Sequence, residues 1–289
     1  KLFNITIMDW LRSKFSKSPA QVKAGAIGFG VLLTAYIIKK YHTRALEYIC
    51  WKIGYYACNY RKKHRPHTLI LVRHAESEAN IDPLIYARIP DNQIKLTEKG
   101  IQQASEVGKK IAKYVKENDT VTFFVSPFER TRATAREIAK YFPNHRYFED
   151  PRLREQEWGN LQHFQESDDQ RATVLQERTK VGRFYYRFPD GESGSDVYDR
   201  VSLFFESLYR QMENYGNEIS ENRVFVIVSH GVLLRMILMR YERMSIEKYH
   251  NMPNLHNTET LVLKRYPDGR YLVTDRILPD TNSEKPAHQ

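Results

Sequence analysis

The residues best suited to chemistry follow three apolar runs of the chain. The run "LILV" is followed by Arg73 and His74, "VTFFV" leads into "SPFER" with Arg130, and "RVFVIVS" is followed by His230. A neutral imidazole can attack phosphorus, and fixed guanidinium groups match the negative charge that a transferring phosphoryl group spreads over its oxygens. These residue types favour phosphoryl transfer, provided that the fold brings them together.

The positive side chains define the role we expect for each group. Arg73 and Arg130 would bind the phosphoryl oxygens and disfavour protonation of His74, which keeps that imidazole nucleophilic. A leaving alkoxide needs a proton, and Glu155 in "RLREQEWGN" is the candidate acid. With organic cations in this role, we expect no metal ion and no cofactor.

Other interpretations of these residues stay open at this stage. A histidine after a buried strand, such as His230, is compatible with a purely structural role, and Glu155 is one of many acids. A metal site built from His64, His67 and His74 is disfavoured, because their spacing matches no established zinc pattern.

The elements that must position these groups alternate along the chain. The segments 68–73, 121–126 and 223–230 read as buried strands, and helical periodicity lies between them. Such alternation predicts an α/β fold with a mostly parallel sheet and helices on both faces. Functional residues gather at the carboxyl ends of the strands in such sheets, so the three strand ends are expected to form one cleft.

Helices are predicted for "LTEKGIQQASEVGKKIAKYV", "FERTRATAREIAKYF" and "SGSDVYDRVSLFFESLYRQM". In the first, Thr97 is the expected N-cap. Its predicted buried face consists of small and apolar residues: Ile101, Ala104, Val107, Gly108, Ile111 and Val115. The tail "TETLVLKRYPDGRYLVT" reads as a hairpin that turns at Pro267–Gly269.

Taken in order, six motifs resemble the histidine phosphatase superfamily, in the branch similar to cofactor-dependent phosphoglycerate mutase. They are "LVRHAESEAN", "LTEKGIQQA", "SPFERTRATA", "LREQEWGN", "FPDGES" and "VSHGVLLR". The resemblance covers roughly residues 67 to 275. It implies a phosphoglycerate mutase-like fold with His74 as the phosphorylated nucleophile and Glu155 as the proton donor. It further implies a phosphate pocket of Arg73, Arg130 and His230.

The loop after His74 both supports and qualifies the resemblance. Asn80 matches a phosphate-contacting asparagine of the family, and Glu76 and Ser77 lie on the same loop. Ala79 stands where true mutases have tryptophan, and their "FTGW" stretch is replaced here by "IDPLIYARIPDNQ". These departures favour hydrolysis of a phosphomonoester over the mutase reaction.

A second basic stretch, "GRFYYRFPDGES", carries Arg183 and Arg187. We expect these two arginines to contact the substrate by clamping a second acidic group on it, with a solvated basic loop as the alternative. The sequence does not distinguish a phosphorylated small molecule from a phosphoprotein as the substrate.

The net charge of +10 belongs to the N-terminal segment. Residues 1–66 hold 13 Lys and Arg against two acids, whereas residues 67–289 hold 32 basic and 33 acidic residues. A basic, acid-poor leader indicates a membrane surface or an organelle rather than nucleic acid. Cys50 and Cys58, the two cysteines, both lie in this leader and read as free thiols.

Within the leader, the apolar run from Ala24 to Ile38 predicts a short transmembrane helix near 22–41. Small residues on this run would let neighbouring helices approach closely, which indicates other membrane protein subunits as partners. The basic leader fits the mitochondrial inner membrane, with the endoplasmic reticulum as the alternative.

The sequence thus predicts two parts, a membrane-anchoring leader at 1–66 and a catalytic domain at 67–289. The expected function is that of a membrane-anchored, metal-independent phosphomonoesterase acting through phospho-His74. The alternative is a phosphatase-like domain that serves as a structural or accessory subunit of a mitochondrial membrane complex. A phosphoglycerate mutase is the third and least favoured reading.

Overall fold

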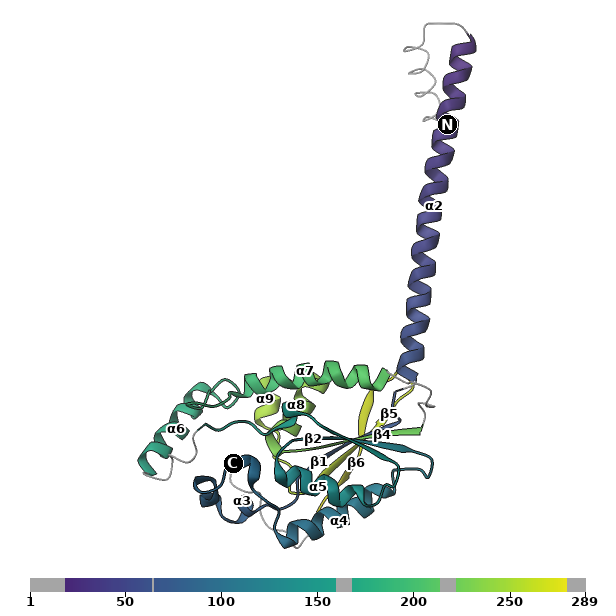
Figure 1. Ribbon diagram of the computed structural model, residues 1–289. Helices are drawn as coiled ribbons and strands as arrows, with labels where there is room; N and C mark the ends of the chain where they lie inside the picture. The colour runs from purple at the N-terminus through teal and green to yellow at the C-terminus, as the bar shows by residue number, and fades with distance from the viewer. Residues whose placement is uncertain (1–18, 64, 160–167, 214–221, 280–289) are drawn as a thin grey trace. The chain divides into compact units, whose positions relative to one another are not determined.

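The computed structural model describes residues 19–63, 65–159, 168–213 and 222–279 (Figure 1). The chain divides into two compact units, Lys1–Tyr60 and Arg61–Gln289. This boundary lies six residues before the division between residues 66 and 67 that the sequence predicts.

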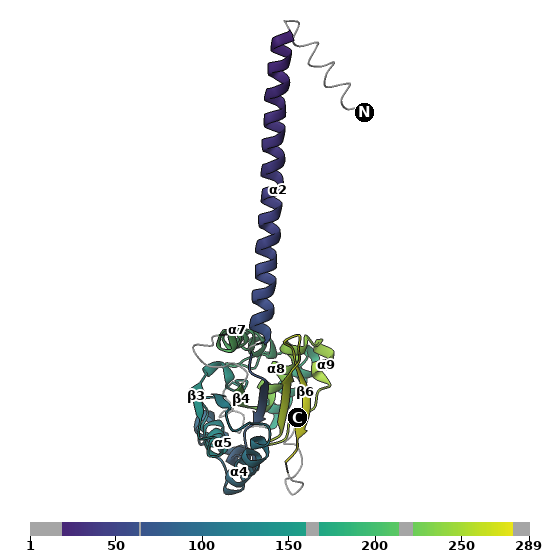
Figure 2. The same ribbon diagram turned by 90° about the vertical axis from the view of Figure 1, so that its right-hand side faces the viewer.

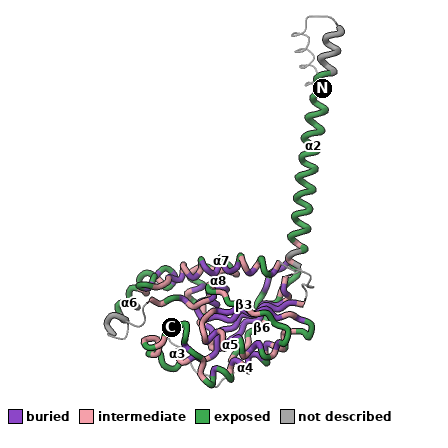
Figure 3. Tube along the Cα trace, in the orientation of Figure 1, coloured by how far each residue is buried: buried purple, intermediate pink, exposed green. Residues whose placement is uncertain are grey.

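The predicted N-terminal helix is present as α2, which spans Pro19–Lys63 and begins with the residue type best tolerated at a first helical position. The described part of α2 is coloured mostly as exposed in Figure 3. Many of its large apolar residues are among the exposed ones, including Leu32 and Trp51. No acid lies in its first turn.

The prediction of a transmembrane segment near 22–41 is not confirmed. Among the residues that the structure describes, no helix is long and apolar enough to cross a membrane. The uncharged run from Ala24 to Ile38 would cover about 22 Å of helix, whereas a bilayer core is about 30 Å thick. Lys23 and Lys39 bound this run directly.

The second unit is built on a six-stranded sheet in the order β3-β2-β4-β1-β5-β6. The strands are β1 (Thr68–Arg73), β2 (Thr120–Val125), β3 (His145–Glu149), β4 (Arg223–Ser229), β5 (Thr260–Arg265) and β6 (Tyr271–Ile277). The pairs β1–β4, β4–β2 and β2–β3 are parallel, and β5 pairs antiparallel with both β1 and β6. The mostly parallel sheet is therefore confirmed, and β3 is an edge strand that the sequence did not reveal.

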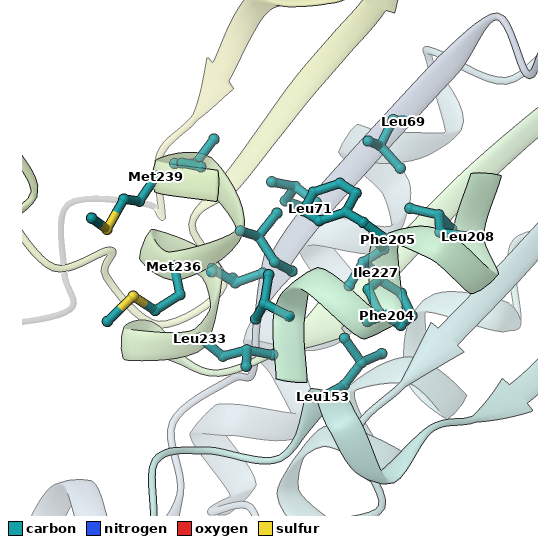
Figure 4. Packing of buried hydrophobic residues seen from close by; sticks show 14 of the residues in the cluster. Leu69, Leu71, Leu153, Phe204, Phe205, Leu208, Ile227, Leu233, Met236 and Met239 are labelled. Atoms are coloured by element: carbon teal, nitrogen blue, oxygen red, sulfur yellow. The ribbon is translucent and has the colours of Figure 1, made fainter. Parts of the chain in front are cut away.

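Helices cover both faces of the sheet, as predicted. On one face α7 (Gly194–Glu213) and α8 (Gly231–Glu242) pack on Leu69 and Leu71 of β1, with α9 (Ile246–His250) beside them (Figure 4). On the other face α4 (Glu98–Ala112) and α5 (Glu129–Ala139) pack on Ile70 and Val72. Successive residues of β1 enter opposite clusters because side chains alternate along a strand.

The predicted cap of α4 is confirmed, since the hydroxyl of Thr97 accepts a hydrogen bond from the N–H of Gly100. Its buried face is mostly as expected, with Ala104, Val107, Gly108 and Ile111 inside. Ile101 is 44% exposed, so its prediction as a core residue is wrong. Gly100 is buried in its place, because the helix begins tight against the loop after β1.

The remaining segments connect the strands and helices of the two layers, several of which are labelled in the turned view of Figure 2. Between β1 and α4 lie α3 (Glu78–Ile81), η1 (Pro83–Ala87) and η2 (Asp91–Gln93). The chain between β3 and α7 contains η3 (Pro151–Leu153) and α6 (Asp168–Val181). The hairpin β5–β6 turns where predicted, with Gly269 at φ 83°.

Candidate active site

The three predicted strand ends lie side by side in the sheet. In the parallel register Arg73 of β1 is the partner of Ser229 of β4, and Val125 of β2 is the partner of Val228. The backbone N–H of His74 donates to the carbonyl of Ser229 at 2.8 Å. Parallel pairing thus delivers the residues that follow β1, β2 and β4 to one edge, as the alternation of elements implied.

His74 and His230 face each other at this edge. Their ring centroids are 5.2 Å apart, with the planes at 62°. Both residues are buried, at 5% and 0% exposure. The structure therefore brings together the two histidines that the sequence placed after separate strands.

Hydrogen bonding fixes the reactive nitrogen of His74. Its Nδ1 lies 2.7 Å from the carbonyl oxygen of Ala75. Because a carbonyl can only accept, Nδ1 must carry the proton, and in the neutral ring the lone pair belongs to Nε2. A neutral His74 thus presents Nε2 as its nucleophilic atom.

The surroundings keep both imidazoles neutral. Burial lowers the pKa of His74 well below its usual value, and the charges of Arg130 and Arg73 lower it further. The pKa of His230 is likewise lowered, by burial first and then by Arg130 and His74. Desolvation and nearby positive charge both disfavour an imidazolium, so a protonated ring is costly here.

Ser126 and Phe128, both from the loop after β2, hold His230. The Ser126 hydroxyl lies 2.8 Å from Nε2, and the Phe128 ring packs with its centroid 5.1 Å from the imidazole. The Nδ1 of His230 is buried and makes no hydrogen bond to the part of the chain that the structure describes.

Two buried arginines supply positive charge beside the histidines. Arg73 donates from Nη1 to the carbonyl of Leu255, and its buried Nε has no partner among the described residues. Arg130, the second residue of α5, packs over the Phe128 ring at 4.9 Å. Its Nη1 donates to the carbonyl of Asp91 at 2.7 Å and to the Asp91 carboxylate at 2.6 Å.

Glu155 lies at the N-terminus of α8. Its carboxylate accepts hydrogen bonds from the N–H groups of Leu233 (3.2 Å), Val232 (3.3 Å) and Gln156 (3.0 Å). The first turn of a helix attracts negative charge, which explains why the side chain docks there. Its charge acts on Arg73, so it belongs to the same group of side chains.

Asn80 is oriented by three donors. Its Oδ1 accepts from the N–H and the hydroxyl of Ser77, both at 2.9 Å, and from the amide of Asn257 at 3.1 Å. This arrangement leaves the NH₂ group of Asn80 able to donate outwards. Glu76 points elsewhere, since its carboxylate contacts Thr97 and pairs with Lys99 at 3.0 Å.

The two arginines expected to clamp a second acidic group are both exposed. Arg187 pairs with Asp196 at 2.6 Å, and within the described residues no hydrogen bond joins Arg183 to the histidines or to Glu155. Arg183 instead acts electrostatically on Arg178 and Tyr249. The structure therefore places these two residues in different environments.

Several residues of the site were not found from the sequence. Asp91 and Tyr86 come from the segment 81–93, which the comparison with mutases marked only as a departure. Burial and the neighbouring Asp91 raise the pKa of Tyr86 to about 12, so its hydroxyl keeps its proton near neutral pH. The side chain of Asn257 donates to the carbonyl of His74 at 3.1 Å. The two residues are 183 positions apart, so no local sequence pattern predicts this contact.

A metal centre is not apparent in the described part of the chain. There, no group of three or more His, Cys, Asp or Glu side chains is placed to hold a metal ion. Of the histidines once considered together, His67 binds Asp119 at 2.9 Å, His74 binds the Ala75 carbonyl, and His64 lies outside the described residues.

Comparison with known proteins places these residues in a family. The profile of the histidine phosphatase superfamily (branch 1) matches residues 69–276. The phosphoglycerate mutase-like protein AT74 of Arabidopsis thaliana is 42% identical over 216 residues, which are 71% of this chain and 67% of that protein. The broad-range acid phosphatase DET1 of Saccharomyces cerevisiae is 26% identical over 74% of this chain and 90% of its own length.

Solved structures show the same fold. A mycobacterial glucosyl-3-phosphoglycerate phosphatase superposes with a TM-score of 0.55 at 22% identity, covering 72% of this chain and 97% of that one. A protein described as mycobacterial hydrolase 1 gives a TM-score of 0.57 at 21% identity, with the same coverage. At these identities the likeness concerns the fold alone.

Proposed function

The chain belongs to branch 1 of the histidine phosphatase superfamily and is a phosphatase of that superfamily, and from this membership we propose that it hydrolyses phosphomonoesters through a phosphohistidine on His74. The observation that carries the proposal is the state of His74. It is buried and kept neutral between two arginines, and its Nδ1 is bound to a carbonyl so that Nε2 is the free nucleophile.

In the first step Nε2 of His74 attacks phosphorus, and the bond from phosphorus to the ester oxygen breaks. The leaving alkoxide takes a proton from Glu155, whose carboxyl is held at the N-terminus of α8. In the second step water attacks the phosphohistidine, gives a proton back to Glu155, and releases phosphate and free His74. The proton and the phosphoryl group therefore balance over the cycle.

Charge stabilisation in both steps is assigned to Arg73, Arg130 and His230, with the NH₂ of Asn80 as a further donor. The arginines are buried, so their charge acts in a medium of lower dielectric than water. The orphaned Nε of Arg73 and Nδ1 of His230 suit phosphoryl oxygens as partners. With these cations at the site, we propose a reaction that needs no metal ion and no cofactor.

Hydrolysis is proposed in preference to mutase chemistry because of the segment 81–93. It brings Tyr86 and Asp91 to the site, where mutases carry a different sequence. The proposed substrate is a phosphorylated small molecule or a phosphoprotein. DET1 is described as a broad-range acid phosphatase. This description agrees with a site whose assigned residues bind the phosphate group rather than the rest of the substrate.

The test is the hydrolysis of phenyl phosphate by the full chain with a chelator present. We expect His74→Ala to lower kcat/KM by about 10³-fold or more, since it removes the nucleophile. The native protein should also trap acid-labile phosphate on His74. His42→Ala on α2 is the matched control and should behave as native. A folded native protein without turnover, or full activity in His74→Ala, would contradict the proposal.

We also propose that α2 holds the phosphatase at a membrane surface, with the mitochondrial inner membrane favoured over the endoplasmic reticulum. Exposed aromatic residues on α2, including Tyr48, Trp51 and Tyr55, stack along the helix beside basic side chains. Aromatic and basic residues on one helix suit the interface of an anionic bilayer.

Flotation with anionic vesicles tests this attachment. The full chain should float, the double variant Trp51→Ser with Tyr55→Ser should float several-fold less, and vesicles without anionic lipid should recover less of both. If the chain ignores vesicles and instead co-purifies in fixed ratio with membrane proteins, the accessory-subunit alternative replaces surface attachment.

A further inference from the structure

The segment that carries the proton donor has no regular structure of its own. Residues 154–159, which include Glu155, lie outside any helix or strand. The Glu155 side chain nevertheless has to reach the N–H groups of Val232 and Leu233 at the start of α8. A displacement of about 1 Å in a reacting group can lower the rate about 100-fold. Whatever fixes this segment therefore contributes to the reaction through Glu155.

One buried arginine holds the backbone of this segment. Arg200 lies on α7 and is 8% exposed. Its Nη1 donates to the carbonyls of Arg152 at 2.6 Å and Arg154 at 2.9 Å, and its Nη2 donates to the carbonyl of Glu155 at 3.0 Å. A single rigid guanidinium group thus binds three carbonyl groups of the segment, and the third belongs to the proton donor itself.

The carboxylate of Glu192 holds this guanidinium group in turn. Its two oxygens accept from Nε and Nη2 of Arg200, both at 3.0 Å, and Oε1 also accepts from Arg154 at 2.5 Å. Burial lowers the pKa of Arg200, and the hydrogen-bonded carboxylate of Glu192 opposes this shift. Removal of either partner leaves the other charge buried without compensation, so the two side chains act as one unit.

Glu192 also binds the residues that follow the proton donor. Its Oε2 accepts from the N–H of Glu157 at 3.0 Å, and its own N–H donates to the carbonyl of Glu157 at 2.8 Å. Its carbonyl accepts from the side-chain amide of Gln156 at 2.8 Å. Glu155 therefore lies between two points of attachment, one on each side along the chain.

We propose that Arg200 and Glu192 are positioning residues, which hold the Glu155 carboxyl where it protonates the leaving oxygen. Within the described residues, every side-chain hydrogen bond of Arg200 goes to Glu192 or to the segment that carries Glu155. The charge of Arg200 also acts on His230, so the experiment has to separate these two routes. The inference rests on the proposed phosphatase function and adds the residues on which proton donation depends.

The experiment compares two substrates that differ in their need for a proton. Phenyl phosphate releases a basic phenolate, whereas 2,4-dinitrophenyl phosphate releases a stable anion that leaves without a proton. In the full chain, Arg200→Met should lower kcat/KM about 100-fold for phenyl phosphate and less than about threefold for the dinitrophenyl ester. Glu192→Gln keeps the shape of the side chain and should show the same pattern at about tenfold. A route through His230 would instead affect both substrates alike.

A double variant shows whether the effect passes through Glu155. Glu155→Gln removes the proton donor and should lower kcat/KM selectively for phenyl phosphate. In that background Arg200→Met should add less than about twofold, because two changes that act through one group are not additive.

Two control variants separate positioning from general damage to the fold. Arg210→Met removes an arginine from the exposed part of α7 and should behave as native. Val201→Ala removes packing from a fully buried position next to Arg200 and should change both substrates by the same factor. Circular dichroism shows that each variant is folded, and Glu192→Gln carries the test if Arg200→Met is not.

The backbone amide signals of Val232 and Leu233 in NMR spectra report the place of Glu155 without turnover. Arg200→Met should move both signals toward their positions in Glu155→Ala, because in both variants the two N–H groups lose their acceptor. Unmoved signals would overturn the positioning role. Moved signals together with a native chain that hydrolyses neither ester would support the positioning role and contradict the phosphatase function.

The kinetic outcomes separate the two proposals as well. Equal losses on both substrates in Arg200→Met would overturn the positioning role and leave the phosphatase function standing. An undiminished effect of Arg200→Met in the Glu155→Gln chain would do the same, since the arginine would then act by another route.

Discussion

At the scale of single residues, Asp91 binds Arg130, one of the groups that are proposed to bind the substrate phosphate. Its carboxylate and its carbonyl both accept from Nη1 of Arg130, which is 3% exposed. A carboxylate at an arginine in a phosphate pocket either competes with the phosphate or holds the guanidinium in place. Asp91 lies on η2, a segment of three residues. We therefore expect its carboxylate to compete with the substrate phosphate for Arg130.

Asp91→Asn should therefore tighten the binding of inorganic phosphate, measured as competitive inhibition of phenyl phosphate hydrolysis, by about tenfold. The amide keeps the shape of the side chain and removes its charge. Asp82→Asn, in the same segment, is the control and should leave inhibition unchanged. Weaker phosphate binding in Asp91→Asn would instead identify Asp91 as a residue that positions Arg130.

The two buried histidines make stability depend on pH. In the unfolded chain a histidine has a pKa of about 6.5, whereas burial and positive neighbours lower the pKa of His74 and His230 well below this value in the folded state. Below pH 6.5 the unfolded chain therefore binds more protons than the folded one. Stability must fall with acid from this point until the folded-state pKa values are reached.

Urea unfolding at pH 7.5 and pH 5.5 measures this effect. Each histidine should contribute a loss of up to about 1.4 kcal/mol in total between these two pH values, so His74→Ala should show a smaller loss than the native chain. His42→Ala, on the exposed surface of α2, should keep the native pH dependence. Equal slopes for the native chain and His74→Ala would contradict the buried neutral state.

At the scale of elements, the start of α4 supports the loop that follows His74. A Cβ added at Gly100 would lie 2.0 Å from the carbonyl oxygen of Glu76, a backbone atom that cannot move alone. This carbonyl also accepts from the N–H of Thr97, the residue that caps α4. Helix and loop therefore have to shift together if the space between them is filled.

Gly100→Ala should lower the free energy of unfolding by about 1–3 kcal/mol, the usual cost of overpacking, and should also lower kcat/KM because the loop carries Ser77 and Asn80. Thermal unfolding and phenyl phosphate hydrolysis measure the two effects. Gly54→Ala is the matched control, since a Cβ there meets nothing within 4 Å. If the two variants unfolded alike, the close contact at Gly100 would be unimportant.

The elements that sequence patterns predicted are those with strong local signals. Buried strands β1, β2 and β4, the capped helix α4 and the hairpin β5–β6 all follow from periodicity, caps and turn residues. The strand β3, mostly exposed along "HRYFE", has no such pattern because it lies at the edge of the sheet.

The site was predictable where strand ends carry it and not where long-range packing does. His74, Arg73, Arg130 and His230 follow from the parallel sheet, because adjacent strands must end together. Asn257 and Asp91 reach the same place through irregular loops, whose path depends on tertiary contacts. The different environments of Arg183 and Arg187 were likewise not predictable, because the ion pair of Arg187 with Asp196 depends on tertiary structure.

At the scale of the whole molecule, the unit Arg61–Gln289 contains both hydrophobic clusters and every residue assigned to the reaction. We therefore expect a chain that begins at Arg61 to keep its kcat/KM on phenyl phosphate within about twofold of the full chain. It should also keep its thermal midpoint and lose vesicle binding. Loss of activity on this truncation would show that the N-terminal unit takes part in catalysis.

The position of Asn257 has a consequence for the synthesis of the protein. The carbonyl of His74 accepts from the Asn257 side chain, 183 residues later, and Arg73 donates to the carbonyl of Leu255. Neither hydrogen bond can form until these later residues have been synthesised. The central strand β1 likewise stays without its neighbours β4 and β5 until most of the chain has left the ribosome. A nascent chain that ends before Asn257 therefore contains the nucleophile His74 without an assembled phosphate site. It also exposes the apolar strand β1, to which chaperones would have to bind.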